Sequence, residues 1–291
     1  MQAPDWSSLS AHAFGRPFRR YHARAISGGD IHQAWLLESE LGAFFVKRNH
    51  ARHAELLTTE AECLSHLNAS GVVRCPQVLH CTQDNQQACL WLEYLPMRQQ
   101  GDAFKRGQQL AQLHRQTHPQ FGWHQPNYIG YTPQLNTPHD NWIAFYRECR
   151  LRPQFALAQQ RHAPTRLMQL GEQLMAKLDY WFDNYQPVPS LLHGDLWSGN
   201  SAYDQQGEPL FFDPACYYGD RETDLAMSEL FGGFEDAFYR GYQTEWPLDV
   251  GYAQRKPLYQ LYHILNHFTL FGGHYAEQAQ RVCEQLVDAL R

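Results

Sequence analysis

The 291-residue chain is 43% hydrophobic and 19% charged, which is ordinary for a globular protein of one or two domains. Its first residues contain no basic start followed by an apolar stretch, and no later apolar run approaches the roughly 20 residues needed to cross a bilayer. The net charge of −6 is not accompanied by a basic patch with interleaved aromatic residues. We therefore expect a cytoplasmic protein that neither spans a membrane nor binds nucleic acid.

Cysteine and histidine spacing gives no sign of a disulfide framework or of a zinc site. The seven cysteines form an odd set without a C-x-x-C pair. Among the sixteen histidines, His263 and His267 stand one helical turn apart, but no third ligand motif accompanies them. Reduced thiols are expected, and any metal should be held by carboxylates.

Short strands dominate the first 95 residues, and one helix interrupts them. The helix is predicted over 53–67, and it carries Glu60. Its apolar positions recur at helical spacing and are Leu56, Leu57, Ala61 and Leu64. The strands are predicted over 21–25, 34–37, 44–47, 77–81 and 88–94.

Helices take over after residue 96. Segments 258–271 and 276–290 have helical periodicity, and so does an apolar stripe formed by Leu167, Leu170, Leu174 and Leu178. A small β-rich insert over 191–213 lies between them. The pattern predicts an α+β chain with a small β-rich N-lobe over 1–95 and a larger, mainly helical C-lobe over 96–291.

The β-rich insert contains HGDLWSGN at 193–200, followed thirteen residues later by Asp213 in LFFDPA. Phosphoryl transfer requires a carboxylate that orients and deprotonates the attacking hydroxyl, and oxygen ligands that hold Mg²⁺. Asp195, Asn200 and Asp213 supply these groups, and the first two keep the separation found in the kinase catalytic loop. Pro214 and Ala215 replace the usual Phe-Gly. The constellation indicates kinase-like chemistry on the two-lobed protein-kinase-like fold.

Nucleotide-binding candidates occur before this motif. Gly28 and Gly29 lie between two strands, where glycines let backbone N–H groups approach a phosphate, although the pair could be only a hairpin turn. Lys47 ends an apolar strand and can contact the phosphates if the helical carboxylate of Glu60 fixes its direction. Solvated surface charges are the alternative, and the order of these residues after the glycine turn favours binding. Glu93 lies where the last strand enters a hinge that would meet adenine.

The chain resembles the fructosamine/ketosamine-3-kinases, a branch of the kinase-like superfamily that also contains aminoglycoside and choline kinases. HGDLW, YYGDRE and FGGF are specific to this branch, whereas HGDxxxxN indicates only the superfamily. Asp30 and His32 depart from it, because they replace commoner small or polar residues. The matching segments are SGGDIHQA at 27–34, EAECLSHL at 60–67, FGW with NYIG at 121–130, DPACYYGDRETDLAMSELFGGF at 213–234 and LYQLYHILNHFTLFGG at 258–273.

The resemblance implies transfer of the ATP γ-phosphate to the 3-hydroxyl of a ketosamine, a sugar attached to an amine such as a protein lysine. Phosphorylation makes the adduct labile, so a deglycation role follows. Asp195 would be the base, Asn200 and Asp213 would hold Mg²⁺, and Lys47 with Glu60 would orient the triphosphate. Glycated amines or proteins would be the partners of a monomer or weak homodimer.

Substrate contacts are less clearly marked in the sequence. Trp197 lies beside the proposed base, and its indole could either stack on a sugar ring or pack in the core. Asp224 is favoured as a structural carboxylate that accepts backbone N–H bonds from the catalytic loop, over a role in substrate binding. His193 is expected to support the same loop, and His267 to face the cleft or cap nearby backbone. Six other aromatic residues could line a sugar pocket, but most of them are expected to pack in the core of the helical lobe: Tyr217, Tyr218, Phe231, Phe234, Tyr262 and Phe271.

Two rival functions share part of this pattern. An aminoglycoside- or choline-type phosphotransferase would keep the base and the metal ligands but should lack the YYGDRE and FGGF segments, which are present. A non-catalytic nucleotide-binding scaffold would usually have lost Lys47, Asp195, Asn200 or Asp213, and all four are present.

Overall fold

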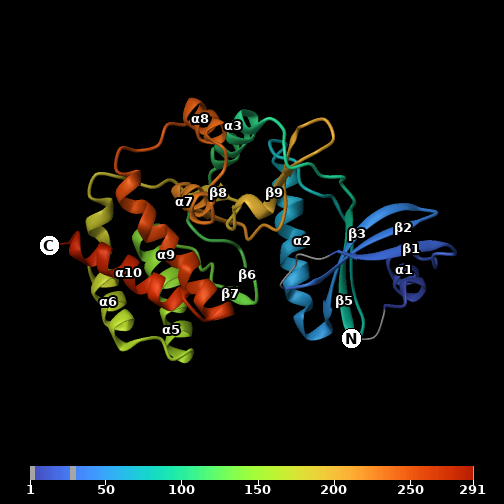
Figure 1. Ribbon diagram of the computed structural model, residues 1–291, viewed down its shortest axis with the longest axis horizontal. Coiled ribbons are helices and arrows are strands. Elements are labelled where there is room, and N and C mark those ends of the chain that lie inside the picture. The colour runs from blue at the N-terminus through green and yellow to red at the C-terminus, as the bar shows by residue number, and fades with distance from the viewer. Residues whose placement is uncertain (1–3, 27–30, 291) are drawn as a thin grey trace.

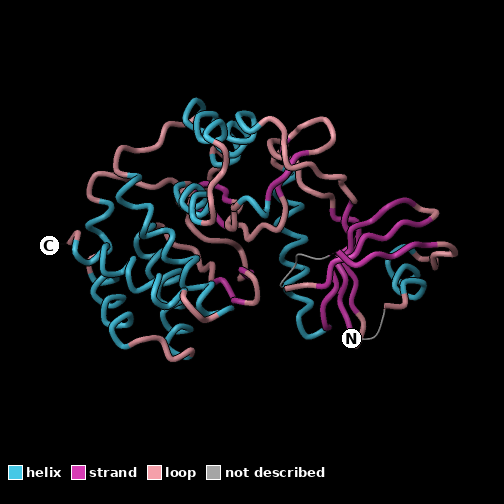
Figure 2. Tube along the Cα trace, in the orientation of Figure 1, coloured by secondary structure: helices cyan, strands magenta, loops and turns pink. Residues whose placement is uncertain are grey.

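The computed structural model describes residues 4–26 and 31–290. They form two lobes, with the sheet on the right of Figure 1 and a larger helical lobe on the left. Figure 2 shows the same segregation, with nearly all long strands on one side and most helices on the other. This arrangement confirms the predicted α+β fold with a small β-rich lobe and a larger helical lobe.

The N-terminal lobe is built on an antiparallel sheet whose strands lie in the order β1-β2-β3-β5-β4. Lys47 on β3 pairs with Ala34 on β2 and with Leu90 on β5, so the central strand holds the lysine firmly. The strand bounds are β1 Tyr21–Ile26, β2 Gln33–Ser39, β3 Gly42–His50, β4 Val78–Gln83 and β5 Gln87–Glu93.

Helices cover both faces of this sheet. Successive side chains of a strand point to opposite faces, so one strand can pack against a helix on each side. On β5, Cys89 and Trp91 pack into a cluster with α1 (Trp6–Phe14), whereas Leu90 and Leu92 pack into the main core with α2 (Ala54–Ala69). Trp6 on α1 meets Trp91 edge to face, with ring centroids 6.0 Å apart. Glu60 lies on α2, so this packing holds its side chain next to the sheet.

The prediction missed α1. The Asp5 side chain caps this helix by accepting a hydrogen bond from Ser8 N at 3.2 Å, and Leu9 and Ala13 repeat at helical spacing on its buried face. Other elements of this lobe agree with the predicted positions to within a few residues, as is usual for element ends.

The C-terminal lobe is mainly helical. Its helices are α3 Ala103–His114, α4 Trp142–Phe145, α5 Arg152–Gln160, α6 Thr165–Ala176, α7 Glu222–Leu230, α8 Asp236–Glu245, α9 Tyr252–Phe271 and α10 Tyr275–Asp288. The short helical turns of this lobe are η2 Tyr146–Leu151, η3 Leu178–Phe182 and η4 Ser198–Asn200. One further turn, η1 Ala51–His53, precedes α2 in the N-terminal lobe. None of the helices within residues 4–26 and 31–290 combines the length and apolar character needed to span a membrane.

Short strand pairs shape the region between the lobes. The predicted β-rich insert is confirmed by β8 Ser190–Leu192, β9 Ser201–Tyr203 and β10 Pro209–Phe211, and β8 pairs with β11 Tyr217–Gly219. A hairpin of β6 Asn127–Ile129 and β7 Thr132–Gln134 was not predicted; in Figure 1 it lies on the side of the helical lobe that faces α2.

Candidate active site

A buried lysine joins two carboxylates from distant parts of the chain. Lys47 Nζ lies 2.6 Å from Glu60 Oε1 on α2 and 2.6 Å from Asp213 Oδ1, which is 166 positions away in sequence. Burial disfavours the ammonium, but the two carboxylates outweigh it and raise the pKa of Lys47. Burial raises the pKa of Glu60 to about 7, against the opposing charge of Lys47. The surface-charge alternative is therefore wrong for Lys47 and Glu60.

Asp195 and Asn200 lie together in the loop between β8 and β9. Asn200 Nδ2 donates to the backbone oxygen of Asp195 at 2.9 Å and to Asp195 Oδ2 at 3.2 Å. This fixes the amide and leaves Asn200 Oδ1 as its acceptor. Burial, with the charge of Asp213 second, raises the pKa of Asp195 to about 7, and the Asn200 hydrogen bond opposes the shift.

Asp213 stands on a strained backbone just after β10. Its φ of 57° is in the left-handed region, which residues other than glycine seldom adopt. Two backbone bonds flank it: Phe212 N donates to Asn200 O at 3.1 Å, and Ala215 N donates to His193 O at 2.8 Å. Strain of this kind persists where surrounding structure enforces it, often at functional sites.

Gly194 is required where the catalytic loop passes this segment. Its φ is +84°, and a Cβ there would lie 2.0 Å from Ala215 O. The loop therefore approaches the Asp213 segment closely enough to exclude any side chain at this position.

Asp224 on α7 supports the catalytic loop from beneath, as predicted. It is buried, and its carboxylate accepts hydrogen bonds from His193 N at 2.7 Å and Gly194 N at 2.9 Å. His114 Nε2 lies 3.1 Å from the same carboxylate. Burial would raise the pKa of Asp224, but the bonds from His114 and the loop outweigh it and lower that pKa.

His193 also supports the loop, as predicted. Its buried ring bonds to Phe212 O through Nε2 at 3.0 Å, and its Nδ1 accepts from Asp195 N at 3.3 Å. Burial lowers the pKa of His193, which keeps the ring neutral.

A cleft of about 970 Å³ between the lobes connects these residues. The residues that line it include Lys47, Glu60, Asp195, Asn200 and Asp213, and also Glu93, Trp197 and His267. The Glu93 carboxylate is itself engaged, because it accepts from Arg74 at 2.7 Å and from Gln77 N at 3.2 Å. Gly28 and Gly29 lie outside the described residues.

Aromatic side chains form one wall of the cleft. Trp197 is 36% exposed, so the alternative that it packs in the core is wrong. Its ring centroid lies 6.2 Å from that of Phe231, which lies 4.7 Å from that of His267. Of the six aromatic residues expected either to line a pocket or to pack in the core, Phe231 and Phe271 line the cleft, whereas Tyr217 and Tyr262 are buried. Sequence spacing could not select Phe231 and Phe271 from the six candidates, because the wall combines residues from separate elements.

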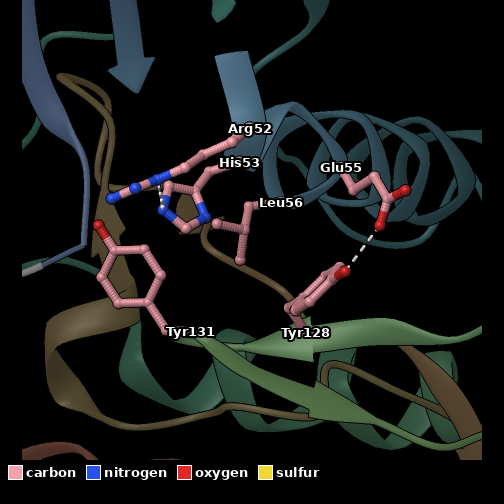
Figure 3. Close-up of a pocket in the computed structure, with 6 residues that line it drawn as sticks. All are labelled: Arg52, His53, Glu55, Leu56, Tyr128 and Tyr131. Carbon is pink, nitrogen blue, oxygen red and sulfur yellow. Dashed lines mark hydrogen bonds between the residues drawn. The ribbon is translucent and has the colours of Figure 1, made fainter. Parts of the chain in front are cut away.

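A smaller cavity of about 420 Å³ adjoins the cleft and shares Leu56 and Tyr128 with it. Figure 3 shows it between the start of α2 and the β6–β7 hairpin, with Tyr128 pointing toward Glu55 and Tyr131 lying below the Arg52 side chain. The Tyr128 hydroxyl donates to Glu55 Oε2 at 2.8 Å. The hairpin thus contacts the helix that carries Glu60.

The two-lobed fold, the Lys47–Glu60 pair and the two loops that carry Asp195 and Asp213 define a phosphotransferase of the protein-kinase-like class. Comparison with known proteins gives the branch: the family model described as fructosamine kinase matches residues 3–289, and the chain belongs to that family.

Individual relatives agree with this assignment. The chain is 45% identical to a probable ketoamine kinase of Synechocystis over 93% of this chain and 92% of that protein. It is 36% identical to the chloroplastic protein-ribulosamine 3-kinase of Arabidopsis thaliana over 92% and 83% of the two chains. A crystal structure of a putative fructosamine-3-kinase from Haemophilus somnus superposes with a TM-score of 0.86, at 28% identity and 96% coverage of both chains.

A more distant likeness extends to an antibiotic kinase fold. The aminoglycoside phosphotransferase APH(4)-Ia, in a ternary complex with ADP and hygromycin B, matches with a TM-score of 0.66 at 15% identity, covering 97% of this chain and 98% of that one. At this identity the likeness shows the fold alone.

Proposed function

We propose that this protein transfers the γ-phosphoryl group of ATP to the 3-hydroxyl of ketosamines, fructosamine or ribulosamine adducts of amines or of protein lysines. The observation that carries the proposal is the cleft in which Asp195 lies beside the Lys47–Glu60–Asp213 cluster, in a chain of the fructosamine kinase family. Relatives named ketoamine kinase and protein-ribulosamine 3-kinase support the acceptor class.

Each site residue has a proposed part in this reaction. Asp195 accepts the proton of the attacking hydroxyl, and its raised pKa of about 7 in the free protein suits a base that works near neutrality. Lys47, directed by Glu60, contacts the phosphates as a point charge. Gly28 and Gly29 would approach the phosphates through their backbone, and the segment at Glu93 would meet adenine.

The donor set in the cleft fits Mg²⁺. Asn200 Nδ2 is used by Asp195, which leaves the amide oxygen free, and Asp213 gives one oxygen to Lys47 and keeps the other. Oxygen donors of this type are those that hard divalent cations prefer. Asn200 and Asp213 would hold the ion, and it would neutralise charge that develops on the phosphates.

The aromatic wall is the proposed acceptor side of the cleft. Trp197 presents an exposed indole next to the base, and an indole face can stack on a sugar ring. His267 is a second proposed contact; its Nδ1 lies 2.8 Å from His263 O one helical turn earlier, which orients the ring. Phe231 stands between the two rings and would complete the wall.

The biological setting follows from the acceptor. Phosphorylation at the 3-position makes a ketosamine labile, so we propose a deglycation role in the cytoplasm, with glycated amines or proteins as substrates. We further propose that the nucleotide-binding lobe comprises residues 1–95, that residues 96–291 form the acceptor lobe, and that the protein is a monomer or weak homodimer.

Mass spectrometry of reaction products tests the function directly. The protein is incubated with MgATP and a panel of fructosyl-amine, ribulosyl-amine and free-sugar acceptors, together with choline and an aminoglycoside. A mass gain of one phosphoryl group on the ketosamines is expected. Phosphorylation of only choline or the aminoglycoside would replace this proposal with the rival phosphotransferase, and no transfer to any acceptor would favour the non-catalytic scaffold.

Removal of divalent cations should abolish turnover, because Asn200 and Asp213 present in the cleft the oxygen donors that would hold the ion next to the phosphates. Activity is measured in excess chelator and after addition of Mg²⁺, Mn²⁺ or Ca²⁺. Recovery with Mg²⁺ or Mn²⁺ is the expected result. Undiminished turnover in the chelator would show that the two residues do not act as metal ligands.

A further inference from the structure

His32 lies in an unexpected place, near the charged residues of the proposed nucleotide site. It is the second described residue after the glycine segment, directly before β2, and it is half-buried. It lines the cleft together with Lys47 and Asp213 and lies within the electrostatic reach of both. The sequence analysis singled it out only as a departure from the commoner residues of this loop.

A single buried side chain decides which ring nitrogen of His32 carries hydrogen. Asn49 Oδ1 accepts from His50 N at 2.8 Å, so the other end of the amide must be the NH₂ group. That end also lies 3.2 Å from Ile31 O, an acceptor, which gives the same orientation independently. Asn49 Nδ2 lies 3.0 Å from His32 Nδ1, so Nδ1 is the acceptor of this bond. In the neutral ring the hydrogen is therefore on Nε2.

The backbone next to His32 is held from the opposite lobe. Tyr131, at the turn between β6 and β7, donates its hydroxyl to Ile31 O at 2.6 Å. Figure 3 shows the Tyr131 side chain rising from the hairpin toward the N-terminal lobe. Asn49 and Tyr131 thus fix the position of His32 directly before β2, and its Nε2 forms no hydrogen bond with the described residues.

We propose that His32 is a phosphate-binding residue whose Nε2–H donates a hydrogen bond to a phosphate oxygen of the bound nucleotide. The inference rests on the proposed function, because it needs ATP in this cleft. An Nε2 that bears hydrogen has no lone pair for a metal, and a bond to an anionic oxygen is stronger than one to a sugar hydroxyl. Burial and the charge of Lys47 lower the pKa of His32 to about 3, so the donor in the free protein is the neutral ring.

Calorimetric titration with MgADP and, separately, adenosine, both without acceptor, tests the contact. His32→Ala should bind ADP about 10-fold more weakly, as expected for loss of a hydrogen bond to a charged group, and adenosine with unchanged affinity. His32→Gln should recover much of the ADP affinity, because its amide can donate from nearly the same point. His22→Ala, on the exposed part of β1, is the matched control and should bind both ligands like the parent.

Two results would overturn the inference while leaving the proposed function intact: unchanged ADP affinity in His32→Ala, or equal weakening of ADP and adenosine. A parent protein that binds neither MgADP nor a non-hydrolysable ATP analogue would overturn both. Long-range ¹H–¹⁵N spectra of the free, histidine-labelled parent give a second readout. Hydrogen on Nε2 of His32 is expected, and the other tautomer would contradict the assignment.

Discussion

Asp195→Asn should lose roughly 10²- to 10⁴-fold in kcat and keep its affinity for MgATP, because that range is typical of general acid–base assistance. Asparagine preserves the shape of the side chain and removes its proton affinity. Asn200 already donates to the Asp195 side chain and backbone, so the loop retains the backbone bond in the variant. Steady-state rate assays give kcat and calorimetry gives the nucleotide affinity, so the two measurements separate chemistry from binding.

Asp213→Asn is the matched comparison, since it makes the same chemical change 18 positions later at the other loop carboxylate. It removes charge from a proposed metal ligand and from the partner of Lys47, so it should raise the Mg²⁺ concentration needed for half-maximal rate as well as slow the reaction. Asp195→Asn should leave that concentration unchanged. A near-parental rate for Asp195→Asn on a ketosamine, in protein with a normal circular-dichroism melt, would remove Asp195 as the base.

The pH dependence of kcat/KM also tests whether Asp195 is the base. A base is active when deprotonated, and the pKa of Asp195 is raised to about 7 in the free protein, chiefly by burial. The parent value of kcat/KM should therefore fall at acid pH, with the midpoint of the fall at about 7 or lower. Bound metal would favour the carboxylate and move this limb to lower pH. In Asp195→Asn the residual rate should lack the limb, and persistence of the limb would assign it to another group.

Much of this site could be predicted because each of its pieces carries a signal that is local in sequence. The separation of Asp195 from Asn200 is fixed by one loop, and periodicity placed Glu60 on a helix and Lys47 on a strand. Lys47 and Glu60 meet because the sheet packs on α2 through Leu90 and Leu92. The order of the elements implied this packing but gave no distances.

Contacts between segments far apart in the sequence were beyond the sequence pattern. The bond from Tyr131 to Ile31 O spans 100 positions, and the bond from His114 to Asp224 spans 110. Nothing in local spacing marks such partners, since a tyrosine or histidine in a helical lobe is ordinary packing material. The residues of the aromatic wall could not be singled out for the same reason: Phe231 is apolar and suited to a core, and only the fold places it beside Trp197.

Asp224→Ala should destabilise the protein strongly. The carboxylate is buried and accepts two backbone N–H bonds from the catalytic loop, so alanine would leave His193 N and Gly194 N without their acceptor, along with His114 Nε2. Loss of a buried charged acceptor with several donors costs about 3–5 kcal/mol. Asp179→Ala, at an exposed carboxylate, is the control and should unfold like the parent. Urea unfolding at pH 7.5 measures both.

Asp224→Asn distinguishes the carboxylate from the space that it fills. The amide keeps the volume but offers only one acceptor oxygen to the two N–H groups, so the loss of stability should be smaller than for alanine and still measurable. Because the folded-state pKa of Asp224 is lowered, its contribution is fully present above the unfolded value near 4 and is lost as the pH falls through the folded value. The stability gap between parent and Asp224→Asn should therefore stay constant from pH 8 to about 5 and shrink below about 4. A gap that is absent at pH 7.5, or that widens in acid, would mean that the Asp224 carboxylate does not hold the catalytic loop.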